Sequence, residues 1–160
     1  APGDCGEGDA LVTDRRRLAL SVLTADCVPV VLTDGTRVAT VHAGWRGIAA
    51  GIVPTALESF DSPDSVVAWL GPAIGPCCYE VGDDVARQVV SASAPSARVE
   101  RGAGKPHLDL HSAVESQLEA RGVEDRRAVS DCTRCQSQAL SSYRRDGARA
   151  GRNLTFAWRS

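Results

Sequence analysis

Cys27 and His42 carry the side chains best suited to chemistry, because a thiol and an imidazole flank one strand–turn–strand pattern. Asp34-Gly35 separates two β-branched runs and predicts a two-residue hairpin, and counting outward from that turn places Cys27 opposite His42. Directly opposed Cβ atoms lie about 4.5–5.5 Å apart, so the pair could share one Zn²⁺ ion or one transferable proton. Pro29 lacks the N–H that this register requires, so a bulge that shifts the pair by one residue stays open.

The segment that follows His42 is a candidate for anion binding. Residues 43–47, with the sequence AGWRG, form a glycine-flanked loop before a predicted helix, where backbone N–H groups and the Arg46 guanidinium could hold an anion.

A structural interpretation of Cys27 and His42 is the alternative to a catalytic one. In it, Cys27 is a small buried apolar residue and His42 is a hydrogen-bonded histidine at the end of a strand.

A second candidate for anion binding lies at residues 143–147, with the sequence YRRDG. Arg144 or Arg145 offers a planar guanidinium that suits a phosphate oxyanion. The alternative is a solvent-exposed turn in which one of the two arginines pairs with Asp146.

The remaining thiols suggest metal or redox chemistry less directly. The sequence has six cysteines: Cys5, Cys27, Cys77, Cys78, Cys132 and Cys135. The spacing of Cys132 and Cys135 suits a zinc half-site or a redox pair, but the adjacent Cys77 and Cys78 lack the two-residue gap usual for the second half of a zinc site. We therefore interpret Cys132 and Cys135 as structural thiols or part of a pocket wall, with a disulfide formed in air as an alternative. Cys77 and Cys78 are assigned no chemical step.

The elements that must position these residues follow from hydrophobic periodicity and turn residues. Strands are predicted over residues 18–23, 28–33, 37–41 and 66–70. Helices are predicted over 48–59, from Asp83 onward and over 110–121, where Gly122 suits a left-handed C-terminal cap. Strands and helices interleave without a clean βαβ period, so we expect one mixed α/β domain of α+β-like character.

Composition bounds the class of protein. A chain of 160 residues with 43% hydrophobic and 24% charged residues is typical of one globular domain. A net charge of −2 creates no global field for nucleic acid or anionic lipid, and no apolar run is long enough to span a membrane. A domain of this size does not need disulfides for stability, so we expect its cysteines to be free thiols in a reducing cytoplasm. The sequence leaves homo-oligomerisation open.

Six motifs, in this order, resemble those of the laccase-domain family. They are TADCVPVV at 24–31, HAGWRG at 42–47, GPAIGPCCYEVG at 71–82, LDL at 108–110, CT at 132–133 and SYRRDG at 142–147. Members of this family are also called polyphenol oxidase, purine nucleoside phosphorylase or peptidoglycan editing factor. The resemblance implies a layered sandwich of mixed sheets flanked by helices, similar to a Cys–His toxin deamidase.

The resemblance also implies an activity. It points to a zinc-dependent enzyme that phosphorolyses purine nucleosides, including methylthioadenosine, and deaminates adenosine, with nucleoside and phosphate as its partners. An older family label implies copper-dependent oxidation of phenols, but three histidines cannot build a multi-copper array. The family holds its metal with two histidines and one cysteine, and two of these ligands fall on Cys27 and His42.

The family's first metal-ligand histidine lies in a QVHG motif upstream of the GDALVT segment, which in this sequence begins at Gly8. The sequence has no methionine and starts at Ala1, so we expect residues 1–160 to be a single laccase-like domain that is truncated at its N-terminus. His107 and His111 are the only other histidines and thus the candidates to replace the missing ligand.

The predicted site then follows residue by residue. Cys27, His42 and Arg46 are the expected catalytic residues, and Cys27 and His42 the expected metal ligands. The expected substrate-binding residues are Arg46, Cys78, Tyr79, Arg144 and Arg145. Two other functions remain open: a metal-free Cys–His hydrolase or amidase that acts on a cell-wall precursor, and an inactive truncated binding module.

Overall fold

The computed structural model describes residues 8–102 and 104–160. A five-stranded mixed sheet forms its centre, with the order β1-β4-β3-β5-β8. These strands are β1 (Ala10–Thr13), β4 (Val38–Ala43), β3 (Val28–Thr33), β5 (Val67–Leu70) and β8 (Asp125–Ala128). Neighbours pair antiparallel except β5 and β8, which are parallel.

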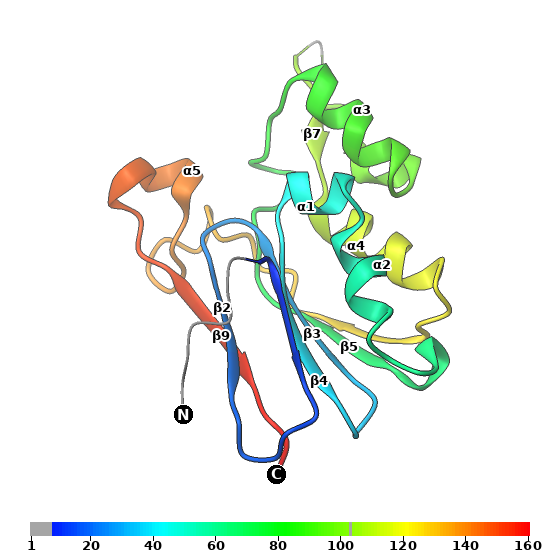
Figure 1. The fold of residues 1–160 in the computed structure, drawn as a ribbon. Coiled ribbons are helices and arrows are strands. Elements are labelled where there is room, and N and C mark those ends of the chain that lie inside the picture. The colour runs from blue at the N-terminus through cyan, green and yellow to red at the C-terminus, as the bar shows by residue number, and fades with distance from the viewer. Residues whose placement is uncertain (1–7, 103) are drawn as a thin grey trace.

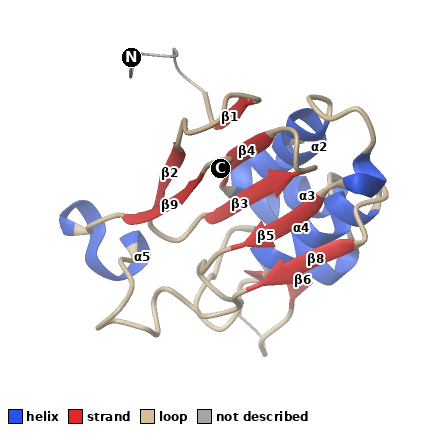
Figure 2. Ribbon diagram, turned by 90° about the horizontal axis from the view of Figure 1, so that it is seen from below, coloured by secondary structure: helices blue, strands red, loops and turns tan. Residues whose placement is uncertain are grey.

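Four helices cover one face of this sheet (Figure 2). They are α1 (Trp45–Ala49), α2 (Ile52–Leu57), α3 (Asp83–Ser91) and α4 (Leu110–Glu119). On the opposite side, β2 (Leu20–Thr24) and β9 (Asn153–Ala157) form a two-stranded antiparallel sheet (Figure 1). The expected layered arrangement of mixed sheets and flanking helices is confirmed.

Short elements complete the chain. β6 (Arg98–Val99) pairs with β7 (His107–Leu108), and α5 (Tyr143–Asp146) precedes β9. Single 3₁₀ turns cover Pro63–Ser65, Pro95–Ala97 and Gly147–Arg149. In the described part of the chain, no helix is both long and apolar enough to cross a membrane.

The core lies between the central sheet and the helices. Val28, Val30 and Leu32 of the middle strand β3 are completely buried. They pack with helical side chains that include Ile48 and Leu118. Full burial of each such aliphatic side chain contributes about 1.5–3 kcal/mol to folding, so the strand that leads away from Cys27 is held rigidly.

The predicted helix over residues 48–59 is interrupted. It forms two short helices, because Gly51 has a φ of +78° and starts α2 in the left-handed conformation that glycine tolerates. The predicted helix from Asp83 is confirmed, and α4 begins where Asp109 caps it by accepting the N–H of Ser112. Gly122 adopts the left-handed conformation expected after α4.

The predicted two-residue hairpin is wrong. Strand pairing ends at Thr33 and Val38, so the turn spans four residues, 34–37. The reason is local: Asp34 Oδ1 accepts the N–H groups of Thr36 and Arg37, both at 2.7 Å, and so stabilises a wider turn. Each residue of β3 therefore faces a residue two positions later than predicted.

Candidate functional site

Cys27 and His42 still meet, at the end of the β3–β4 pair. The observed register places Pro29 opposite His42 and Val28 opposite Ala43. A shift of two residues keeps a side chain on the same face of a sheet, whereas a shift of one would have moved it to the other face. The predicted neighbours are thus a diagonal pair rather than directly opposed residues.

Gly44 provides the space into which both side chains point. A Cβ atom added at Gly44 would lie 3.0 Å from Cys27 Sγ and 3.9 Å from His42 Nε2. The thiol and the imidazole therefore converge above a backbone position that has no side chain. Glycine is required here for a close approach and not for an unusual φ, because Gly44 is extended, with a φ of −81°.

Asp9 fixes the orientation of the His42 ring. Its Oδ1 lies 2.8 Å from His42 Nδ1, and its carbonyl oxygen accepts the His42 backbone N–H at 2.7 Å. A carboxylate can only accept, so Nδ1 carries the proton and Nε2 is left for the thiol side. Hydrogen bonding to Cys27 raises the pKa of His42 to about 9; burial opposes this rise and Asp9 supports it. Asp9 was not among the predicted site residues, although it lies in the GDALVT segment, in which an acidic residue precedes a strand.

Tyr79 and Arg144 lie on a neighbouring side of the site. The Arg144 guanidinium carbon is 4.9 Å from the centre of the Tyr79 ring, and Arg144 Nη1 donates to the carbonyl oxygen of Glu80 at 2.8 Å. Burial raises the pKa of Tyr79 to about 12; the charge of Cys27 adds to this rise and Arg144 opposes it. Tyr79 therefore keeps its phenolic proton at neutral pH and can donate a hydrogen bond.

The three candidate phosphate-binding arginines differ in how their donors are used. Arg46 is exposed and stacks on Trp45, with its guanidinium carbon 4.6 Å from the ring centre. Arg145 donates to the carbonyl oxygens of Thr133 and Leu140, both at 2.9 Å, and makes a bidentate pair with its neighbour Asp146. Arg145 thus stabilises the surrounding loops, whereas Arg46 and Arg144 are exposed.

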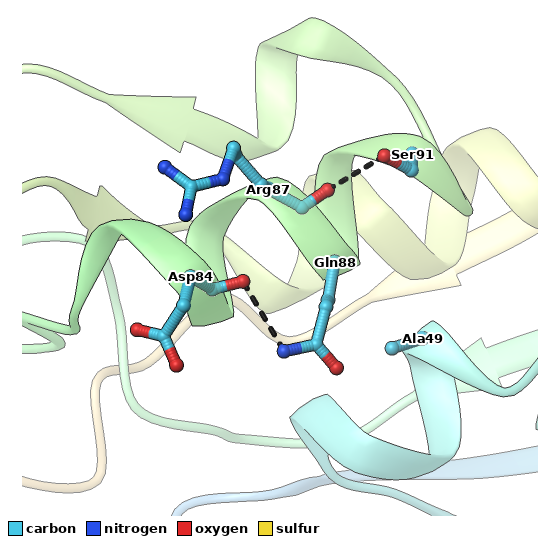
Figure 3. Close-up of a pocket in the computed structure, with 5 residues that line it drawn as sticks. All are labelled: Ala49, Asp84, Arg87, Gln88 and Ser91. Carbon is cyan, nitrogen blue, oxygen red and sulfur yellow. Dashed lines mark hydrogen bonds between the residues drawn. The ribbon is translucent and has the colours of Figure 1, made fainter.

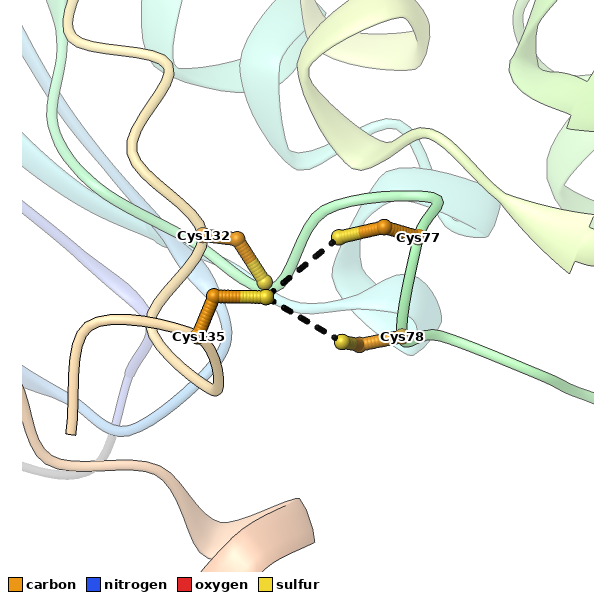
Figure 4. Close-up of side chains that lie close together, drawn as sticks. All are labelled: Cys77, Cys78, Cys132 and Cys135. Carbon is orange, nitrogen blue, oxygen red and sulfur yellow. Dashed lines mark hydrogen bonds between the residues drawn. The ribbon is translucent and has the colours of Figure 1, made fainter.

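Four cysteines form a second cluster, which Figure 4 shows. Cys77 and Cys78 lie in the loop between β5 and α3, and Cys132 and Cys135 lie in the segment between β8 and α5. All four sulfur atoms lie within 4.8 Å of one another. The missing two-residue gap between Cys77 and Cys78, which argued against a second ligand pair, does not prevent their thiols from converging with those of Cys132 and Cys135.

The thiols of this cluster differ in acidity. Burial raises the pKa of Cys132, but hydrogen bonds from the Gly75, Cys135 and Arg134 N–H groups and from the Cys77 thiol together outweigh it, and the pKa falls to about 7. Burial and the neighbouring thiols raise the pKa of Cys77 to about 12. Without a metal, the cluster therefore concentrates its negative charge on Cys132.

His107 and His111 lie elsewhere. His111 Nε2 is hydrogen bonded to the carbonyl oxygen of Gly71 at 2.9 Å, and His107 belongs to β7. Within residues 8–102 and 104–160, the only group of three or more ligand-type side chains that converge is the four-cysteine cluster. The structure therefore brings neither histidine to Cys27 and His42 as a third ligand. Cys5 lies outside the described residues.

A shallow hollow separates α1 from α3 (Figure 3). It has a volume of about 460 Å³ and is lined by Ala49, Asp84, Arg87, Gln88 and Ser91. Gln88 and Ser91 donate to backbone carbonyl oxygens of their own helix. Ala49 and Gln88 also line a second hollow, of about 290 Å³, together with Trp45 and Arg46. Neither hollow is lined by Cys27 or His42.

The mixed α/β fold is shared with solved proteins. The structure of YlmD from Geobacillus stearothermophilus superposes with a TM-score of 0.88 at 35% sequence identity, over 94% of this chain and 60% of that chain. A Neisseria meningitidis protein described under the family DUF152 superposes with a TM-score of 0.91 at 37% identity, over 96% of this chain and 65% of that chain.

The chain belongs to the laccase-domain family. The family model described as multi-copper polyphenol oxidoreductase laccase matches residues 2–160, which confirms the resemblance carried by the six motifs. A Streptomyces coelicolor protein named purine nucleoside phosphorylase is 45% identical over 156 residues, covering 94% of this chain and 63% of the relative. Purine nucleoside phosphorylase YfiH of Escherichia coli is 39% identical over 155 residues, with the same coverage of 94% and 63%. The chain thus spans less than two thirds of the length of these curated relatives.

Proposed function

We propose that this chain carries the metal-binding and substrate-binding residues of a zinc-dependent purine nucleoside phosphorylase that also cleaves methylthioadenosine and deaminates adenosine. The observation that carries the proposal is the convergence of Cys27 Sγ and His42 Nε2 above Gly44, with Asp9 bonded to the other ring nitrogen. The names of the relatives from Streptomyces coelicolor and Escherichia coli support the phosphorylase activity.

Cys27 and His42 supply two of the three protein ligands that a catalytic zinc site uses. A thiolate and an imidazole nitrogen are the ligands that Zn²⁺ prefers, and a catalytic site keeps a position open for substrate or water. Histidine ligands commonly donate their second N–H to a carboxylate, which is the role that Asp9 takes toward His42. Copper also accepts these donors, but a multi-copper oxidase needs more histidines than the three in this sequence.

The chain's own residues account for binding and orientation. A zinc ion at such a site supplies Lewis acidity toward an attacking oxygen. Arg46 and Arg144 would pair with phosphate oxygens through charge-assisted hydrogen bonds. Tyr79, which keeps its proton, would donate to a ribose hydroxyl or to the base. In phosphorolysis a phosphate oxygen attacks the anomeric carbon of ribose, the carbon–nitrogen bond to the base breaks, and the base leaves with a proton from phosphate or solvent. In deamination water adds to the purine carbon that carries the amine, the carbon–nitrogen bond breaks, and the amine leaves as ammonia with a proton from that water.

The test is product analysis with zinc-loaded protein. Incubation with adenosine and phosphate should release adenine and ribose 1-phosphate, and inosine should appear where deamination occurs. Cys27→Ser and His42→Ala should each abolish both reactions, whereas Arg152→Ala should leave them unchanged, because the bonds of the Arg152 side chain within the described residues are to the carbonyl oxygens of Ala150 and Gly151. Folded, zinc-loaded protein that yields neither adenine nor inosine would overturn the proposal.

A metal-free Cys–His hydrolase is the second candidate. The observation that favours it is the chain of contacts from Asp9 through His42 to Cys27, which has the order of an orienting carboxylate, an imidazole and a nucleophilic thiol. This function requires Cys27 to alkylate rapidly in the presence of a chelator. Slow alkylation of Cys27 in zinc-free protein would exclude it, and loss of nucleoside phosphorolysis on chelation would favour the zinc enzyme.

A further inference from the structure

We propose that Cys77, Cys78, Cys132 and Cys135 bind one Zn²⁺ ion as a structural tetrathiolate centre, separate from the pair formed by Cys27 and His42. Four sulfur atoms within 4.8 Å of one another suit this ion, because structural zinc sites are four-coordinate, tetrahedral and closed to substrate. Soft thiolate ligands also discriminate against magnesium and calcium, which prefer oxygen.

The sulfur positions match the size of the ion. A Zn–S bond of about 2.3 Å places the sulfurs of a regular tetrahedron about 3.8 Å apart. Cys135 Sγ lies 3.8 Å from Cys77 Sγ and 3.5 Å from Cys78 Sγ. No pair in the cluster is more than 4.8 Å apart. Small rotations of the side chains therefore suffice to admit the ion, and Cys77 and Cys135 are exposed, which gives the ion a route from solvent.

Backbone hydrogen bonds order the two loops that carry the thiols. Cys78 donates its N–H to Gly75 O at 2.9 Å, and Cys135 donates its N–H to Cys132 O at 3.1 Å, so each ligand pair lies on its own turn. The two turns are joined by a bridge between Ala73 and Cys132 and by the N–H of Thr133, which donates to Ala73 O at 3.0 Å. Preformed ligand positions reduce the ordering cost of metal binding.

Gly75 supports the centre in two ways. Its N–H donates to Cys132 Sγ at 3.2 Å, the kind of contact to a ligand atom that orients metal ligands. A Cβ atom at this position would lie 3.3 Å from Cys132 Cβ and 3.4 Å from Cys77 Sγ. A side chain at Gly75 would therefore crowd ligands from both turns.

The proposed ion would hold together two segments that lie beside the Cys27–His42 site. Tyr79 directly follows Cys78, and Thr133 directly follows Cys132. Thr133 Oγ1 donates to Asp26 Oδ1 at 2.6 Å, and Asp26 precedes Cys27. Cys78, which was expected to bind substrate, would then hold the ion, and the four cysteines would act as positioning residues.

The experiment measures zinc rather than activity. In the double variant Cys27→Ser/His42→Ala, which lacks the first site, native mass spectrometry under reducing conditions should still find one zinc ion per chain. Adding Cys78→Ser and Cys135→Ser should remove that ion, whereas adding Gln136→Ser as a matched control should not. Substitution with Co²⁺ in the double variant should give the sulfur-to-metal charge-transfer absorption and intense ligand-field bands of a tetrahedral thiolate site.

Thermal unfolding provides a second readout. Zinc should raise the Tm of the double variant in a concentration-dependent way and leave the Tm of the variant without Cys78 and Cys135 unchanged. The proposal is overturned if the double variant retains no zinc, if loss of Cys78 and Cys135 does not lower its zinc content, or if the thiols form disulfides under reducing conditions in place of binding metal. None of these results depends on phosphorolysis, so the proposed activity can fail while the zinc centre stands.

Discussion

Thr133 donates its hydroxyl to Asp26 Oδ1 at 2.6 Å, across 107 positions of the chain. Both residues are buried, and Asp26 Oδ2 also accepts the backbone N–H of Arg144 at 2.6 Å. The carbonyl oxygen of Asp26 accepts the N–H of Ile74 at 2.9 Å. Asp26 therefore joins three segments around the candidate site.

Substitution of Asp26 tests this connecting role. Asp26→Asn removes the charge but tolerates the observed φ of +93°, so we expect a loss of about 1–3 kcal/mol in the free energy of unfolding. Asp26→Ala should cost more, because it leaves both donors unpaired and places alanine in a left-handed conformation. Urea denaturation measures both losses; an unchanged midpoint for Asp26→Ala would contradict the role.

The titration of His42 in metal-free protein should be displaced upward. Its pKa of about 9 lies above the 6.5 of an unperturbed histidine, so the stabilisation from protonated His42 is complete below pH 6.5 and is lost as the pH rises through about 9. Nuclear magnetic resonance of the ring protons measures this pKa directly. Asp9→Asn and Cys27→Ser should each lower it, and an unshifted His42 would show that the three side chains do not interact.

Gly44→Ala should weaken zinc binding at the pair without unfolding the chain. The added methyl group would lie 3.0 Å from Cys27 Sγ and would push the thiol away from His42. We expect zinc affinity at this site to fall by about 10–100-fold, measured by chelator competition in a variant that lacks Cys78 and Cys135. Gly47→Ala is the matched control, because its closest new contact, at 3.2 Å, is to the Ile52 side chain and not to Cys27 or the His42 ring. Equal affinities in both variants would contradict the proposed ligand pair.

Substitution of Arg144 should affect phosphate binding, and substitution of Arg145 should affect the stability of the fold. Arg144→Ala should raise the KM for phosphate about tenfold with little change in unfolding free energy, because it removes an exposed phosphate-binding candidate. Arg145→Ala should instead destabilise the fold by about 1–3 kcal/mol, because it leaves the carbonyl oxygens of Thr133 and Leu140 without this donor. Steady-state kinetics and urea denaturation of both variants measure these effects. A higher KM for Arg145→Ala and a lower stability for Arg144→Ala would contradict the assigned roles.

Alkylation of the cysteine cluster should be suppressed by zinc. Cys132, with a pKa of about 7, is far more acidic than Cys77, with a pKa of about 12, so in metal-free protein Cys132 should alkylate first as the pH rises toward neutrality. Mass mapping of alkylated peptides measures this order. Zinc should slow the alkylation of all four thiols together, and protection of only some of them would contradict a tetrathiolate centre.

Local patterns in the sequence determined much of the framework. The run at 28–33 predicts β3 because four of its residues are aliphatic, and Gly122 predicts that α4 ends before it because glycine readily adopts the left-handed conformation common after helices. The pairing of Cys27 with His42 also follows from local spacing. This prediction holds although the predicted turn is wrong, because a register shift of two residues leaves each side chain on the same face of its strand.

Tertiary structure decided the rest. The Asp34 side chain sets the length of the β3–β4 turn through its hydrogen bonds. The hydrogen-bond partner of His42 Nδ1 is Asp9, which lies 33 residues away in the sequence. The four thiols join two loops that are 57 or 58 positions apart where they touch, and it is the backbone bridge between Ala73 and Cys132 that brings them together. Periodicity and turn chemistry act over a few residues, so they specify elements, whereas a metal site built from distant loops exists only once the sheet has set their separation.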